Sequence, residues 1–105
     1  MIGVDLVYIP EFEKQLGLGG QSYLNRAFNA DELANQDSTH LAGLWAAKEA
    51  VFKASPQDTP NGATSVAVTI NPSGRPSATL DGTRYDVSIS HHGEYAIAIA
   101  IRSNQ

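Results

Sequence analysis

Residues 41–54 read LAGLWAAKEAVFKA, and this helix-forming run predicts the central helix of the protein, from about His40 to Ala54. At about 100° per residue, its large apolar side chains fall within one arc of about 120°. These side chains are Leu41, Leu44, Trp45, Val51 and Phe52. We therefore expect this arc to face the core.

Three charged residues interrupt the apolar helix. Lys48 lies inside the arc, so its ammonium must either extend to solvent or meet an anion, and no acidic residue lies three or four positions away. Glu49 and Lys53 are four residues apart among small alanines. They suit either an ordinary surface ion pair or a place where a ligand approaches closely. Two lysines and a carboxylate on one helix also suit a phosphate-bearing ligand with a divalent cation.

The first strand-like segment contains a carboxylate. IGVDLVYI, residues 2–9, alternates with period two and is largely apolar on both faces, so we expect this strand to be covered on both sides. Asp5 lies within it, where burial is costly unless the carboxylate is paired or bound to a metal. The alternative is an aspartate at the strand edge that faces water or caps the helix expected after Pro10.

The remaining segments predict an α+β fold, with a mainly antiparallel sheet packed against one main helix and short helices. Helices are expected from Pro10 to the glycines at positions 17, 19 and 20, and over residues 22–28. Asn29 and Glu32 resemble a capping box. Further strands are expected at residues 65–70, 77–80, 85–90 and 95–101, with Asp81-Gly82 as a hairpin turn.

Two downstream segments carry polar groups that could contact a phosphate. The polar residues around the end of the strand expected at 85–90 are Ser88, Ser90, His91 and His92. Earlier in the chain, Gly74-Arg75-Pro76 presents a guanidinium, a fixed fork of donors suited to phosphate. The commoner explanations are turn histidines and a turn that enters a strand.

Length and composition narrow the class of protein. A chain of 105 residues predicts a single domain over 1–105, small enough to gain from oligomerisation. The net charge of −4 argues against non-specific nucleic-acid binding, and the absence of cysteine excludes disulfides and thiolate catalysis. No apolar stretch is long enough to span a membrane, and no signal peptide is expected, so a cytoplasmic location is the default.

Several segments together resemble holo-acyl-carrier-protein synthases, the small bacterial type of 4′-phosphopantetheinyl transferase. The similarity rests on IGVDLVYI near the start, WAAKEAVFKA in the main helix, GRP in the turn and VSISHHGEYAIAIAI at the end. YLNRAFNADELA, residues 23–34, is a weaker match. The order and spacing of these segments are similar over nearly the whole chain.

The resemblance implies transfer of the 4′-phosphopantetheine arm of coenzyme A to a serine of an apo acyl carrier protein, with Mg²⁺ as cofactor. It implies metal ligands at Asp5 and Glu49 and catalytic roles for Glu49 and Lys53. The coenzyme-binding residues that it implies are Lys48, Lys53, Arg75, Pro76, Ser90 and His91. It leaves open whether Glu49 or a metal-bound water oriented by Glu49 removes the serine proton. It also implies a homotrimer with sites between subunits.

Two positions depart from the family pattern. Leu44 stands where relatives usually carry an arginine associated with coenzyme contacts, and Glu11 lies where they commonly carry arginines that hold the carrier protein. One alternative is therefore a homologous domain that binds coenzyme A or a carrier protein without efficient transfer. Another is a small metal-dependent phosphoesterase that shares the same metal ligands.

Overall fold

A five-stranded antiparallel sheet and two helices form the structure, a computed structural model that describes residues 1–104. In chain order the elements are β1 (Ile2–Tyr8), α1 (Ile9–Ala27), η1 (Glu32–Ala34), α2 (Ser38–Ala54), η2 (Gly62–Ser65), β2 (Ala67–Ile70), β3 (Pro76–Leu80), β4 (Thr83–His92) and β5 (Tyr95–Arg102). The predicted α+β class with a main helix on an antiparallel sheet is confirmed. Neither helix of the described residues has the length and apolarity that a bilayer crossing requires.

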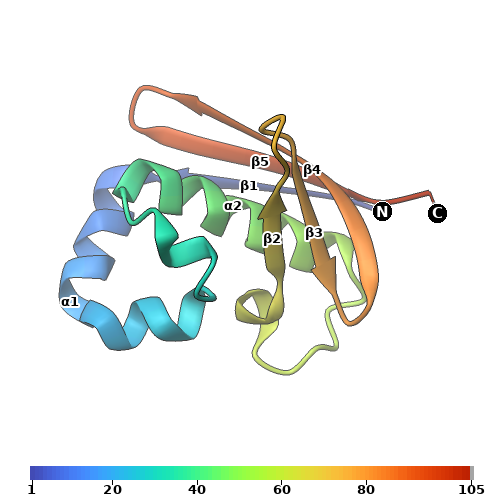
Figure 1. Ribbon diagram of the computed structural model, residues 1–105, viewed down its shortest axis with the longest axis horizontal. Coiled ribbons are helices and arrows are strands. Elements are labelled where there is room, and N and C mark those ends of the chain that lie inside the picture. Colours follow the sequence, from blue (N-terminus) through green and yellow to red (C-terminus); the bar gives the residue numbers. More distant parts are fainter. Residues whose placement is uncertain (105) are drawn as a thin grey trace.

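The sheet has the strand order β1-β5-β4-β3-β2, and α2 packs across one face of it (Figure 1). Strand β1 is an edge strand paired only with β5, so Ile2 opposes Ile101 and the two ends of the chain lie side by side. Helix α1 curls around one end of α2, away from β2 and β3. Asp5 of β1 lies beside the C-terminal part of α2, where it contacts Lys53 of the last turn, and strands β5 and β4 separate β1 from β3 in the sheet.

Small residues bring α2 very close to the sheet. The alanines of α2 and β5 that face each other are fully buried, and they remove the bulk that would hold the two layers apart. At Gly3 of β1, an added Cβ would lie 1.8 Å from the carbonyl oxygen of Ala50. Strand β1 therefore lies directly on the backbone of α2.

The helix boundaries follow local signals. The prediction that the glycines end the first helical segment and that a second one follows is confirmed: α1, Ile9–Ala27, consists of two segments joined at a kink at Gly20, whose φ of 59° and ψ of −154° are not helical. The predicted capping box is confirmed, because the Asn29 amide donates to Glu32 and the Glu32 amide donates to Asn29, at 2.8 and 2.9 Å. Helix α2 begins before His40 because the side chain of Asp37 accepts a hydrogen bond from the His40 amide.

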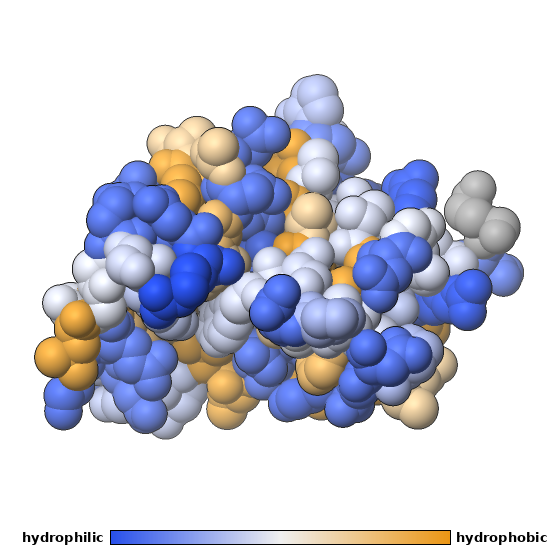
Figure 2. Space-filling model, turned by 90° about the horizontal axis from the view of Figure 1, so that it is seen from below, coloured by the Kyte–Doolittle hydropathy of each residue, from blue (hydrophilic) through white to orange (hydrophobic). Residues whose placement is uncertain are grey.

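The outer face of the sheet is apolar on β1 and β5. Eight large side chains there are between 42% and 62% exposed: Ile2, Val4, Leu6, Tyr8, Tyr95, Ile97, Ile99 and Ile101. The prediction that the first strand is covered on both sides is thus wrong for a single chain, in which α2 covers only one side. On the face drawn in Figure 2, by contrast, hydrophobic side chains are scattered among hydrophilic ones.

Candidate active site

Two carboxylates and one ammonium meet where β1 crosses α2. Asp5 comes from β1 and Glu49 and Lys53 come from α2; we call these three residues the acidic site. The Lys53 Nζ atom lies 2.9 Å from Asp5 Oδ1 and 3.2 Å from the Val4 carbonyl oxygen. Lys53 is thus paired with Asp5 on the neighbouring element, whereas the simple alternative was a surface pair with Glu49.

The electrostatics of Glu49 reflect this crowding. Burial and the neighbouring Asp5 carboxylate raise the pKa of Glu49, and Lys53 partly opposes the effect. Tyr23 of α1 is also close enough that its own pKa is raised by burial and by the Glu49 carboxylate. Nothing in the sequence pattern linked Tyr23 to the acidic site, because the kink at Gly20 is what turns its helix segment back toward α2.

The acidic site suits a magnesium ion. Asp5 and Glu49 supply hard oxygen donors, and a cation between them would relieve the repulsion that raises the pKa of Glu49. Within residues 1–104, no group of three or more histidine, cysteine, aspartate or glutamate side chains could hold a metal. Two carboxylates leave the other positions to water and substrate phosphate, which is the coordination Mg²⁺ commonly takes. Asp5 and Glu49 line a hollow together with Glu11 and Trp45.

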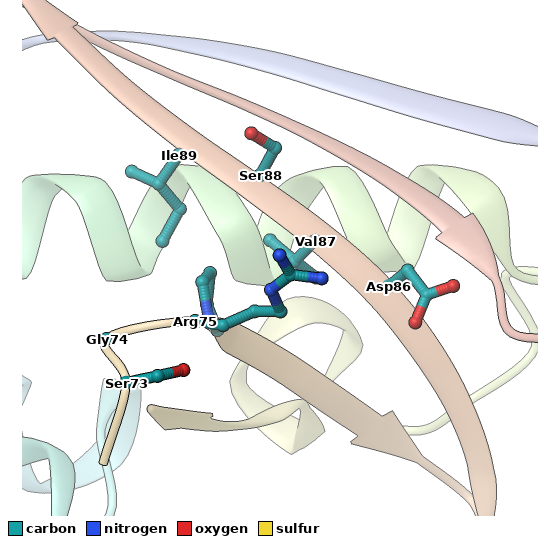
Figure 3. A pocket seen from close by; sticks show the side chains of 8 residues that line it. Ser73, Gly74, Arg75, Asp86, Val87, Ser88 and Ile89 are labelled. Carbon is teal, nitrogen blue, oxygen red and sulfur yellow. The ribbon is translucent and has the colours of Figure 1, made fainter. Parts of the chain in front are cut away.

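Arg75 lies in a second region, at the start of β3. Its side chain extends from the turn toward Val87 of β4, inside a hollow that Ser73, Asp86 and Ser88 also line (Figure 3). The hollow has a volume of about 740 Å³, which is within the usual range of small-ligand sites. We call it the Arg75 hollow.

His91 lies in a smaller hollow that adjoins the Arg75 hollow through Gly74 and Pro76. Its Nε2 atom is 3.2 Å from the Thr39 carbonyl oxygen. Gly43 makes room for the ring, because an added Cβ there would lie 2.9 Å from Nε2. The predicted residues Arg75, Pro76 and His91 are therefore brought together.

Ser90 does not share that pocket. Strand β4 alternates, so Tyr85 and Val87 point to the core while Ser90 lies on the opposite face, paired with Ile97 of β5. His91 lines the smaller hollow, whereas Ser90 is exposed on the outer face of the sheet. A common coenzyme pocket for Ser90 and His91 stays a prediction.

Lys48 is not available to a ligand. Its side chain is 1% exposed, and Nζ lies 2.8 Å from Glu32 Oε1 and donates to the Val66 carbonyl oxygen. Burial lowers the pKa of Lys48, while the Glu32 carboxylate opposes the shift. The prediction of a coenzyme contact at Lys48 is corrected to a structural ion pair that ties η1 and the start of β2 to α2.

The acidic site and the Arg75 hollow are separate in one chain. Their linings share no residue, and strands β5 and β4 lie between β1 and β3 in the sheet. At roughly 4.8 Å per strand, β1 and β3 are about 14 Å apart in the sheet. The structure thus divides the predicted site into a carboxylate part and a cationic part.

The chain carries a carboxylate pair with an adjacent lysine and, separately, a hollow lined by a guanidinium. Together these groups suit a divalent cation and a phosphate-bearing ligand. The model of the 4′-phosphopantetheinyl transferase superfamily matches residues 1–100. The chain belongs to that superfamily.

Relatives and solved structures agree with this assignment. The holo-[acyl-carrier-protein] synthase of Verminephrobacter eiseniae is 36% identical over 118 residues, which cover 95% of this chain and 90% of the relative. The corresponding synthase of Gloeobacter violaceus is 37% identical, covering 92% and 87%. The Helicobacter pylori synthase, crystallised in complex with coenzyme A, superposes with a TM-score of 0.87 at 29% identity and covers 98% of this chain and 100% of its own.

Proposed function

We propose that this protein is a magnesium-dependent holo-acyl-carrier-protein synthase, which moves 4′-phosphopantetheine from coenzyme A to a serine of an apo acyl carrier protein. The observation that carries the proposal is the acidic site: Asp5, Glu49 and Lys53 converge from two elements in a chain whose relatives are named as such synthases. The Helicobacter pylori relative, similar over its full length, holds coenzyme A.

The reaction is a substitution at phosphorus. The serine oxygen of the carrier protein attacks the phosphorus that bears pantetheine, and the bond from that phosphorus to the bridging oxygen of the pyrophosphate breaks. Adenosine 3′,5′-bisphosphate leaves with the bond electrons, and the serine proton goes to a base. A bound Mg²⁺ supplies neutralisation of the charge that grows on the pyrophosphate oxygens.

Glu49 is the proposed proton acceptor, directly or through one water molecule. Burial and Asp5 raise the pKa of Glu49, and a carboxylate with a raised pKa holds a proton better than an ordinary one. Asp5 and Glu49 together would hold the metal. Lys53, half exposed in the last turn of α2, is within reach to donate to a phosphate oxygen.

The coenzyme would contact Arg75, Pro76 and His91 through its nucleotide end. Arg75 is not ion-paired to any carboxylate of the described residues, so its fork of donors is free for a phosphate. Leu44, which is buried and lines the His91 hollow, offers carbon where an arginine would offer a charge. This observation supports the second candidate, a homologue that binds coenzyme A or carrier protein without efficient transfer.

We propose a homotrimer in which the acidic site of one copy meets the Arg75 hollow of the next. Two observations support assembly: the eight exposed apolar side chains of β1 and β5, and the separation of the two parts of the site within one chain. Ser90 lies on that same outer face of the sheet, so in an assembly it would face a neighbouring copy, where it can contribute to a shared site.

The proposal is tested by incubating the protein with coenzyme A, Mg²⁺ and a panel of apo acyl carrier proteins. Mass spectrometry of the carrier should show the addition of one phosphopantetheine group, and Asp5→Ala or Glu49→Gln should abolish it. Coenzyme binding without transfer to any carrier would favour the binding-domain alternative. Release of phosphate from coenzyme A without carrier modification would favour a phosphoesterase.

A further inference from the structure

We infer that Lys53 is an internal cation of the acidic site, which occupies Asp5 in the metal-free protein and leaves it when a divalent cation binds. The inference rests on the proposed metal site and extends it, because metal binding becomes an exchange of one cation for another. Lys53 then has two successive partners: the Asp5 carboxylate before the metal binds, and a substrate phosphate afterwards.

The ammonium of Lys53 contacts the Asp5 carboxylate, which is also a proposed ligand of the metal. Lys53 Nζ is 2.9 Å from Asp5 Oδ1 and 3.2 Å from the Val4 carbonyl oxygen, so it binds two oxygens of the same strand. A magnesium ion would approach the same carboxylate to about 2.1 Å. An ammonium and a divalent cation on one carboxylate repel each other strongly at such short separations.

The two partners differ in their freedom to move. Asp5 is 16% exposed and belongs to a strand that Gly3 fixes against the backbone of α2. Lys53 is 49% exposed and reaches Asp5 with a flexible four-carbon side chain from the last turn of α2. The carboxylate therefore stays in place, and the ammonium is the group that moves.

An internal cation also explains how the carboxylates remain close in the absence of metal. Asp5 raises the pKa of Glu49, and Lys53 acts in the opposite direction, so the lysine offsets part of the repulsion between the two acids. Once a metal takes over this role, the ammonium is released beside the position where a metal-bound pyrophosphate would lie. The exchange thus delivers a phosphate donor only when the metal is present.

The first test measures the position of the lysine without any substrate. The chain has three lysines, and limited acetylation followed by peptide mass spectrometry reports on each. We expect Mg²⁺ to increase the acetylation rate of Lys53 several-fold, compared with a sodium salt at equal ionic strength. Exposed Lys14 serves as the internal control with a constant rate, and buried Lys48 should stay unreactive. An unchanged or reduced rate at Lys53, under conditions where metal binds, would overturn the exchange.

The second test measures metal affinity by electron paramagnetic resonance of Mn²⁺ with the protein alone. Lys53→Met should bind Mn²⁺ about three- to fivefold more tightly, since a partly exposed ion pair no longer has to break. Lys53→Arg should keep the weaker wild-type affinity. Arg84→Met is the matched control, because it removes one positive charge from the start of β4, two strands from β1 in the sheet.

The outcomes separate the inference from the proposed function. If wild-type protein binds no Mn²⁺, or Asp5→Asn binds it normally, the metal site fails and the exchange fails with it. If Asp5→Asn abolishes binding but Lys53→Met binds no more tightly than wild type, only the exchange is overturned. Tighter binding by Lys53→Met, with unchanged affinity in Arg84→Met, supports it.

Discussion

Gly3→Ala should damage the active site without touching any of its functional groups. A Cβ at this position would lie 1.8 Å from the Ala50 oxygen, 2.8 Å from the Ala50 carbonyl carbon and 2.9 Å from the Ala54 nitrogen. All three atoms belong to the backbone of α2, so no side-chain rotation can relieve the overlap. Strand β1 and helix α2 must instead move apart by roughly 1.5 Å, because a normal carbon contact needs at least about 3.4 Å.

This separation acts on stability and on chemistry. Overpacking of this kind costs about 3 kcal/mol, the upper part of the usual range, because the obstacle is backbone. For a domain of this size, that lowers the melting temperature by roughly 12 °C. Asp5 lies two residues from Gly3 on the same strand, and a displacement of about 1 Å in a catalytic group can reduce turnover roughly 100-fold.

Differential scanning calorimetry and the carrier-modification assay measure the two effects. Gly17→Ala is the matched control, since no atom lies within 4 Å of its added Cβ and its place in α1 favours alanine. That variant should gain stability, by up to about 1 kcal/mol, and keep full activity. A Gly3→Ala protein that melts within about 2 °C of wild type and keeps its transfer rate would refute the argument that close packing of β1 on α2 positions Asp5.

Three further predictions concern the ionic and apolar groups. In metal-free buffer at pH 7, Glu49→Gln should be more stable than wild type, because the raised pKa of Glu49 in the folded protein means that folding disfavours the ionised carboxylate. The difference should vanish at a pH below the ordinary carboxyl pKa, where Glu49 is protonated in both states. Equal stability of the two proteins in urea at pH 7 and at the acidic pH would contradict this. Lys48→Met should lose about 3–5 kcal/mol in urea unfolding, because the buried Glu32 carboxylate loses its counter-ion and keeps only backbone amide donors, and adding Glu32→Gln should recover part of the loss. A loss below about 1 kcal/mol would show that the pair does not hold the fold. Ile99→Lys should convert the proposed homotrimer to monomers in analytical ultracentrifugation. Leu18→Lys, which changes an exposed residue on α1, should leave the assembly intact. An intact assembly in Ile99→Lys would place the interface elsewhere.

Much of the fold was predictable because its signals are local. The helical period of residues 41–54, the capping box of Asn29 and Glu32 and the Asp81-Gly82 hairpin each depend on neighbours within a few positions. The start of α2 was also within reach of sequence reasoning, since Asp37 is a good N-cap residue that the prediction overlooked.

The groups that the prediction missed depend on contacts distant in sequence. Lys48 was recognised as a misplaced charge, but its partner Glu32 lies 16 residues earlier and is brought to it only by tertiary packing. The role of Gly3 likewise depends on how closely α2 approaches β1, which no local pattern encodes. Ser90 and His91 are different: strand alternation alone would have placed these adjacent residues on opposite faces.

The most direct test of the shared site is complementation between two defective variants. Glu49→Gln removes the acidic site and Arg75→Ala removes the guanidinium of the Arg75 hollow, so each variant alone should transfer little phosphopantetheine at limiting coenzyme A. After the two proteins are unfolded together and refolded as a mixture, sites that combine an intact Glu49 from one copy with an intact Arg75 from another should restore a substantial fraction of wild-type transfer. If the mixture is no more active than the separate variants, the two parts of the site do not meet between copies, and the proposed active site is wrong.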